Sequence, residues 1–123
     1  MTDRRPKLIF DAISAIELAG SFLADQTLPA YEADVMRRSA VERQLEILGE
    51  ACARLAKEDP TLFERLPATR LAVGLRNRII HGYDAVDDRT VYLTVRDDLP
   101  SLKLGLGHWL AHLTGVLDLP PKH

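Results

Sequence analysis

The chain has 123 residues, of which 46% are hydrophobic and 28% charged, and its formal net charge is −2. This composition fits one globular domain that buries a core without disulfides or metal ions, and the charge gives no global sign of a nucleic-acid-binding protein. A single cysteine, Cys52, excludes a disulfide within the chain and a cysteine-based zinc site, and we expect it to be a small buried residue on a helix. No apolar run has the length of a signal peptide or a membrane span, so a cytoplasmic protein is expected.

Apolar residues recur at three- and four-residue steps along most of the chain, which indicates helices. The first predicted helix follows Thr2 or Asp3, either of which can cap it. It ends near residue 25, because the next segment, DQTLPAYEAD, contains a proline and turn-forming residues. The second helix spans residues 34–57, with an apolar stripe on one face and arginines and glutamates, including Glu50, on the other.

The middle of the chain predicts one short and one longer helix. The segment TLFERLP is a short helical piece, and a third substantial helix covers residues 68–80. Proline stands just ahead of that helix, as is typical of a helix start, and Thr69 is a possible cap. Gly82 is well placed to end the helix.

The last part of the chain resumes the helical pattern after the loop GYDAVDD. Asp87 or Asp88 caps this segment, Pro100 kinks or divides it, and the final helix follows. The whole pattern predicts an all-α, up-and-down bundle of four to five helices. We expect a single domain over residues 1–123, with its core at about 7–117 and a frayed tail at 118–123.

Two weak motifs carry little chemistry. His108 and His112 in HWLAH lie on one helix face at i, i+4, a spacing that begins some zinc sites. The glutamate of HExxH is missing and no third ligand is suggested, so a face covering the core or a subunit contact is favoured. The glycines of LGLGH follow no predicted strand, which argues against a phosphate-binding loop. No metal and no cofactor is therefore expected.

The segment LRNRIIHGYD lies in the one locally basic region of the chain. Between residues 65 and 81 there are four arginines and no acidic residue. Cations near a helix C-terminus interact favourably with the helix dipole, so this pattern is stable without any function. The alternative is an active site built on Arg76 and His81.

The spacing of Arg76 and His81 bears on that choice. Five positions at about 100° per residue separate the two side chains by roughly 140°, so they are poor partners within one straight helix. Asn77 and His81 are neighbours at i, i+4, and the amide could orient the imidazole. An imidazole that moves protons and a guanidinium that stabilises phosphate charge are what metal-free RNA cleavage needs. Two copies of the helix about a two-fold axis could converge these groups, which hints at a homodimer.

Residues 76–83 spell R-x4-H-x-Y, and this motif occurs with other ordered segments, namely QLEILGEACARL, LAVGLRNRIIHGYDAVD and VRDDLPSLK. Together they resemble HEPN-domain ribonuclease toxins of the HepT-like branch, which are paired with MntA-type nucleotidyltransferase antitoxins. The resemblance covers roughly residues 7–110. It implies a helical HEPN fold that dimerises so that the two motifs face one cleft.

The same resemblance implies roles for individual residues. Arg76 and His81 would carry metal-independent RNA cleavage, with Asn77 and Arg78 as supporting residues. Tyr83 would be the residue that the antitoxin adenylylates with AMP from ATP, which silences the toxin. A bulky anionic group two residues from His81 would block the cleft and repel RNA phosphates.

Three points stay open at the level of sequence. Glu50 either faces the same cleft and positions a catalytic residue or is a solvated charge. Gly74, inside a predicted helix, is hypothesised to mark close packing against a partner helix. Instead of an RNA-cleaving enzyme, the chain could be a non-catalytic regulatory subunit that delivers nucleic acid or nucleotide to a nucleotidyltransferase.

Overall fold

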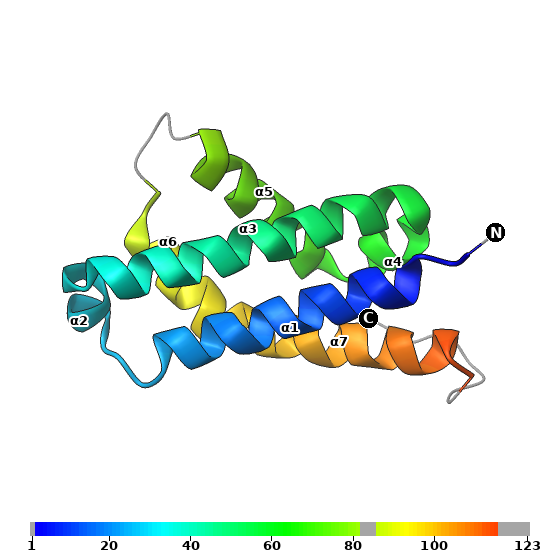
Figure 1. The fold of residues 1–123 in the computed structure, drawn as a ribbon, viewed down its shortest axis with the longest axis horizontal. Helices are drawn as coiled ribbons and strands as arrows, with labels where there is room; N and C mark the ends of the chain where they lie inside the picture. Colours follow the sequence, from blue (N-terminus) through cyan, green and yellow to red (C-terminus); the bar gives the residue numbers. More distant parts are fainter. Residues whose placement is uncertain (1, 82–85, 116–123) are drawn as a thin grey trace.

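The computed structural model describes residues 2–81 and 86–115, and these ranges are almost entirely helical (Figure 1). The long helices α1 (Arg5–Leu23) and α3 (Val35–Glu58) lie antiparallel and side by side, α5 (Pro67–His81) crosses α3, and α7 (Leu99–Leu113) packs against α1. The described residues contain no strand, which confirms the predicted all-α bundle. None of the helices in these two ranges is long and apolar enough to cross a membrane.

Aspartates fix the starts of the two long helices. The Asp3 carboxylate accepts a hydrogen bond at 3.0 Å from the backbone amide of Arg5, the first residue of α1. The Asp34 carboxylate accepts one at 3.0 Å from the amide of Arg37 in the first turn of α3. Both contacts satisfy amides that lack partners inside the helix. The predicted start of the second helix is thus confirmed.

The segment predicted as a turn contains a further helix, α2 (Leu28–Ala33), so that prediction was wrong. Thr27 caps it by accepting a hydrogen bond from the amide of Ala30, and Pro29 stands in its first turn. Proline is tolerated there because the amide it lacks would have no partner. The helix is held by Tyr31, which is buried with its ring centroid 5.9 Å from that of Tyr92.

The next two helices, α4 (Pro60–Arg65) and α5, also begin with proline. Both were predicted, but the cap assigned to Thr69 was wrong. Thr69 is fully buried inside the first turn of α5, and its hydroxyl donates to the carbonyls of Leu66 and Phe63 at 2.6 and 3.0 Å. It therefore ties α5 back to α4 instead of accepting from an amide of its own helix.

The C-terminal segment is divided as expected. Asp87 caps α6 (Asp88–Leu93) by accepting from the amide of Arg89 at 3.1 Å. A π-helical turn, η1 (Thr94–Asp98), follows and leads into α7 just before Pro100. Because proline has no amide hydrogen, the regular hydrogen-bond ladder cannot pass through it, and the wider turn takes up the change.

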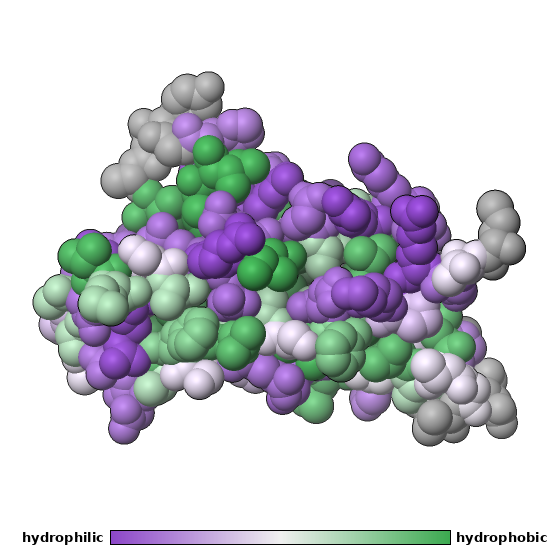
Figure 2. Space-filling view, viewed as in Figure 1, coloured by the Kyte–Doolittle hydropathy of each residue, from purple (hydrophilic) through white to green (hydrophobic). Residues whose placement is uncertain are grey.

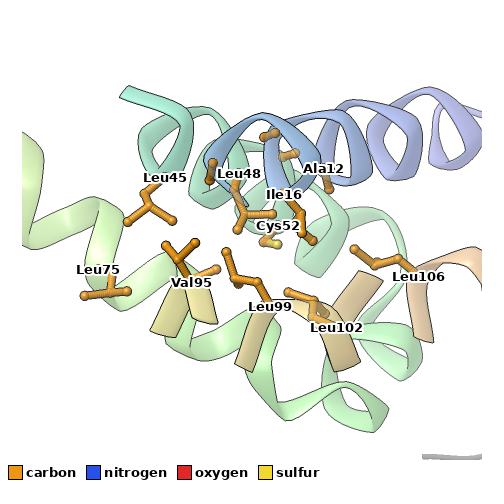
Figure 3. Close-up of a cluster of buried hydrophobic side chains, with 14 of the residues drawn as sticks. Ala12, Ile16, Leu45, Leu48, Cys52, Leu75, Val95, Leu99, Leu102 and Leu106 are labelled. Carbon is orange, nitrogen blue, oxygen red and sulfur yellow. The ribbon is translucent and has the colours of Figure 1, made fainter. Parts of the chain in front are cut away.

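Apolar side chains from α1 and α3 point toward those of α5, η1 and α7 and form one core (Figure 3). Leu48 and Cys52 of α3 face Leu99 and Leu102 of α7 within it. Cys52 is fully buried, as predicted, and burial raises the pKa of its thiol to about 12. Helix α5 packs on the same side of α3 as this core, and Glu50 of α3 lies close enough to α5 to contact Arg76.

Candidate active site

The R-x4-H motif lies on the C-terminal half of α5, where this helix crosses α3. The side chain of Arg76 is 27% exposed and faces α3. His81 is the last residue of α5 and is exposed. The two side chains thus lie in different surroundings, as the helical spacing predicts.

Glu50 of α3 holds the Arg76 guanidinium. Its Oε2 accepts a hydrogen bond from Arg76 Nη2 at 2.7 Å, and its Oε1 accepts one from Arg54 Nε at 3.0 Å. One carboxylate is therefore shared by two guanidinium groups, which fixes both and leaves an excess of positive charge. Glu50 could either position a residue of the motif or be a solvated surface charge, and its contact with Arg76 favours the first interpretation.

Asn77 is also in contact with the guanidinium. Its carboxamide oxygen accepts a hydrogen bond from Arg76 Nη1 at 3.0 Å, a contact that the sequence pattern did not predict. The side chain is exposed, one helical turn before His81, as the i, i+4 spacing requires. Arg78, which lies between Asn77 and His81 in the sequence, is also exposed on α5 and adds a further cation to this part of the helix.

Gly49 allows α5 to come this close to α3. A Cβ atom at position 49 would lie 2.2 Å from Arg76 Cβ and 2.9 Å from the carbonyl oxygen of Ala72. Both distances are far below van der Waals contact, so only glycine fits beneath this crossing. The missing side chain thus sets where the Arg76 backbone lies, and the neighbouring Glu50 then receives its guanidinium.

Sequence reasoning missed Gly49. It considered Gly74 as the site of close helix packing, but within this chain a Cβ at Gly74 would meet nothing within 4 Å. A signal for Gly49 existed, because a glycine in the middle of a 24-residue helix is unfavourable by about 1 kcal/mol relative to alanine and calls for a packing reason. Gly74 remains tied to the hypothesis of a partner helix.

The remaining sequence candidates lie elsewhere. Tyr83 and Gly82 fall outside the described residues, as does the predicted tail. His112 is half-buried and stands edge-on to Trp109, with ring centroids 6.1 Å apart, while His108 is exposed. Across the parts of the chain that the structure describes, no group of three or more His, Cys, Asp or Glu residues is arranged to hold a metal ion.

The arrangement has a defined chemical capacity. A guanidinium fixed by a carboxylate offers its remaining N–H donors to phosphate oxygens in a constant direction. An imidazole can accept a proton from a hydroxyl group or donate one to a leaving oxygen, which is general acid–base catalysis. A helical bundle that carries these two groups five residues apart at the end of one helix is consistent with the HEPN class of proteins.

Comparison with known proteins gives the same class. The family model described as "Ribonuclease HepT-like" matches residues 12–107. A protein of Thermococcus cleftensis named "Probable ribonuclease HepT" is 36% identical over 93 residues, which are 76% of this chain and 84% of that protein. A Methanocaldococcus jannaschii protein named as a "Putative RNase" is 30% identical over 95 residues, 77% of this chain and 81% of its own length.

A third relative, from Caldanaerobacter subterraneus and also named as a "Putative RNase", is 34% identical over 70 residues, which are 57% of this chain and 62% of that protein. No solved structure matches the chain. The family match covers most of the chain and includes the whole R-x4-H motif. The chain therefore belongs to the HepT-like ribonuclease family.

Proposed function

We propose that this chain is a metal-independent endoribonuclease that cleaves RNA with Arg76 and His81. The observation that carries the proposal is the position of the Arg76 guanidinium. Arg76 lies on α5, the helix that ends in the exposed His81, and Glu50 of α3 accepts a hydrogen bond from its guanidinium at 2.7 Å. Membership of a family of ribonucleases supports the same activity.

The two side chains would divide the chemistry between them. His81 takes the proton from a ribose 2′-hydroxyl, or gives one to the leaving 5′-oxygen, while the 2′-oxygen attacks phosphorus and the bond from phosphorus to the 5′-oxygen breaks. Arg76 stabilises the additional negative charge on the phosphorane-like transition state. Glu50 and Asn77 position the guanidinium and do not contact the reacting atoms.

We propose further that the site is completed in a homodimer. Arg76 faces α3 whereas His81 lies exposed at the end of α5, and two copies about a two-fold axis would bring Arg76 of one chain close to His81 of the other. The open space at Gly74, one turn before Asn77 on the same helix, would accommodate a partner helix. A Gly74→Leu change should then weaken dimerisation, and an unchanged mass by light scattering would contradict this.

The proposed partner protein is an MntA-like nucleotidyltransferase antitoxin that silences the toxin by adenylylating Tyr83. The tyrosine follows His81 by two residues, so an attached AMP would bring negative charge next to the imidazole and repel RNA phosphates. In this reaction the tyrosine oxygen attacks the α-phosphorus of ATP, and pyrophosphate leaves.

The test of the nuclease activity is incubation of the purified protein with total RNA in EDTA. We expect the wild type to cut, and Arg76→Ala and His81→Ala each to lose the activity, with Arg70→Ala as a control arginine on α5 outside the motif. Cleavage that survives in both motif variants would refute the site. A wild type that never cuts but binds its transferase tightly would favour the regulatory-subunit alternative.

Adenylylation has a separate test. With a cognate transferase, ATP and Mg²⁺, the intact mass of the protein should rise by whole AMP units, and Tyr83→Phe should abolish the rise. Tyr31→Phe is the matched control, because Tyr31 is fully buried in α2. A mass increase that persists in Tyr83→Phe would move the modification to another residue.

A further inference from the structure

A groove of about 500 Å³ extends from Arg76 toward the start of α1. Its floor includes Leu8 and Ala53, and cationic side chains of α3 and of the chain segment before α1 line it. Figure 2 shows hydrophilic side chains gathered over the C-terminal half of α3 and the beginning of α1. The volume falls within the range of small-molecule binding sites.

The groove is positively charged although the chain as a whole is not. Four cations line it, Arg4, Arg54, Lys57 and Arg76, against two carboxylates, Glu50 and Glu58. The whole chain has a formal net charge of −2. Cationic charge is thus concentrated along this groove.

Two of these cations lie outside the ion pairs formed among the described residues. Most arginines and lysines of the chain are in ion pairs, and Arg54 and Arg76 share Glu50 in this way. Arg4 and Lys57 are exposed, and within residues 2–81 and 86–115 neither is in an ion pair. Exposed cations in a hollow are suited to binding an anion from solution.

The spacing along α3 fits an extended anion. Glu50, Arg54 and Lys57 follow one another at i, i+4 and i+7, which places them along one face of the helix over about 10 Å. Arg76 contacts Glu50 at one end of this row, and Arg4 precedes Arg5, which pairs with Asp59 just beyond the C-terminal end of α3. A row of cations that begins at the proposed catalytic arginine matches successive phosphates of a polynucleotide.

We infer that this groove binds the phosphodiester backbone of single-stranded RNA next to the cleaved bond. Arg4 and Lys57 contact phosphates, and Arg54 does so while it also holds Glu50. The inference rests on the proposed function, because it takes the Arg76 end of the groove as the reactive end. Contacts to phosphates carry no sequence information, so the groove strengthens binding of all RNA sequences alike.

The experiment measures RNA affinity separately from cleavage. Binding of a fluorescent single-stranded RNA by the His81→Ala variant is followed by anisotropy over a series of KCl concentrations. Adding Arg4→Gln or Lys57→Gln to this background should weaken binding and lower the salt slope by about 0.7 for each phosphate contact removed. Glu58→Gln should have the opposite effect and tighten binding.

Lys7→Gln is the matched control. It removes the same charge from α1, but Lys7 lies outside the groove and pairs with Asp11 at 2.8 Å. This control should leave the salt slope unchanged, and equal losses in Lys7→Gln and Lys57→Gln would overturn the inference. Displacement of RNA by ATP from the parent variant but not from Lys57→Gln would also overturn it, because the groove would then hold a free nucleotide.

The outcomes separate this inference from the proposed function. If the wild type cuts RNA and Lys57→Gln keeps its affinity and salt slope, the groove does not bind RNA, and the proposed nuclease activity is still supported. If the wild type does not cut but Lys57→Gln loses affinity, the groove binds RNA, and the proposed nuclease activity is refuted. In a cutting enzyme, Lys57→Gln should raise KM and leave kcat unchanged.

Discussion

Arg76 lies directly over Gly49, so that a methyl group at position 49 would stand 2.2 Å from the Cβ of the arginine. The contact joins the motif helix to the helix that carries Glu50, and the next residue along α3 then receives the guanidinium. A backbone position with no side chain thus determines where the proposed catalytic cation is held. The consequence can be measured at Gly49 itself.

Gly49→Ala should reduce both stability and activity. The methyl group must push α5 away from α3, and overpacking of this kind typically costs about 1–3 kcal/mol, more than the gain of about 1 kcal/mol from better helix propensity. Urea denaturation and RNA cleavage measure the two effects. Gly20→Ala, in open space on α1, should be neutral or stabilising, and a Gly49→Ala protein as stable and active as wild type would contradict the steric role.

Glu50→Gln should lower kcat without raising KM, because it also removes one of the two carboxylates of the groove. The amide keeps the shape of the side chain but loses the charge that fixes the guanidinium groups of Arg76 and Arg54, so the transition state loses a prepositioned cation. We expect a decrease of roughly tenfold, equivalent to about 1.4 kcal/mol. Glu46→Gln, one turn earlier on α3, is the control, and equal effects of both variants would argue for a general charge effect.

Mixed dimers test whether the site is shared between two chains. Arg76→Ala and His81→Ala would be co-expressed with different tags, and the mixed species purified through both. If Arg76 of one chain acts with His81 of the other, one of the two sites remains complete and roughly half the wild-type activity should return. A mixed dimer as inactive as its two parents would mean that both groups act within one chain.

The buried thiol predicts a loss of stability at high pH. Because burial raises the pKa of Cys52 from 9.0 to about 12, the thiol ionises in the unfolded chain before it ionises in the folded protein. Its contribution is therefore fully present below pH 9 and decreases between pH 9 and about 12, by up to about 1.4 kcal/mol per pH unit. Urea unfolding of wild type and Cys52→Ala over this pH range tests the effect. The difference between their free energies of unfolding should become smaller as the pH rises.

The sequence alone determined the long helices and the motif. Apolar periodicity placed the long helices to within a few residues, since a repeat near 3.6 residues is a local property of the chain. Asp34 was correctly recognised as the boundary of a helix. Pro29 was misinterpreted as a helix breaker, because the same residue interrupts a helix interior and favours a first turn.

The surroundings of the motif were decided only by the tertiary structure. The spacing of Arg76 and His81 could be read along one helix, and it predicted that they diverge. Glu50 lies 26 residues before Arg76, and the contact between them depends on where α5 crosses α3. That crossing is set by packing at Gly49, and the groove depends in turn on the register of α1 against α3. Helical periodicity fixes which face a residue occupies, but only the packing of one helix on another fixes which faces meet.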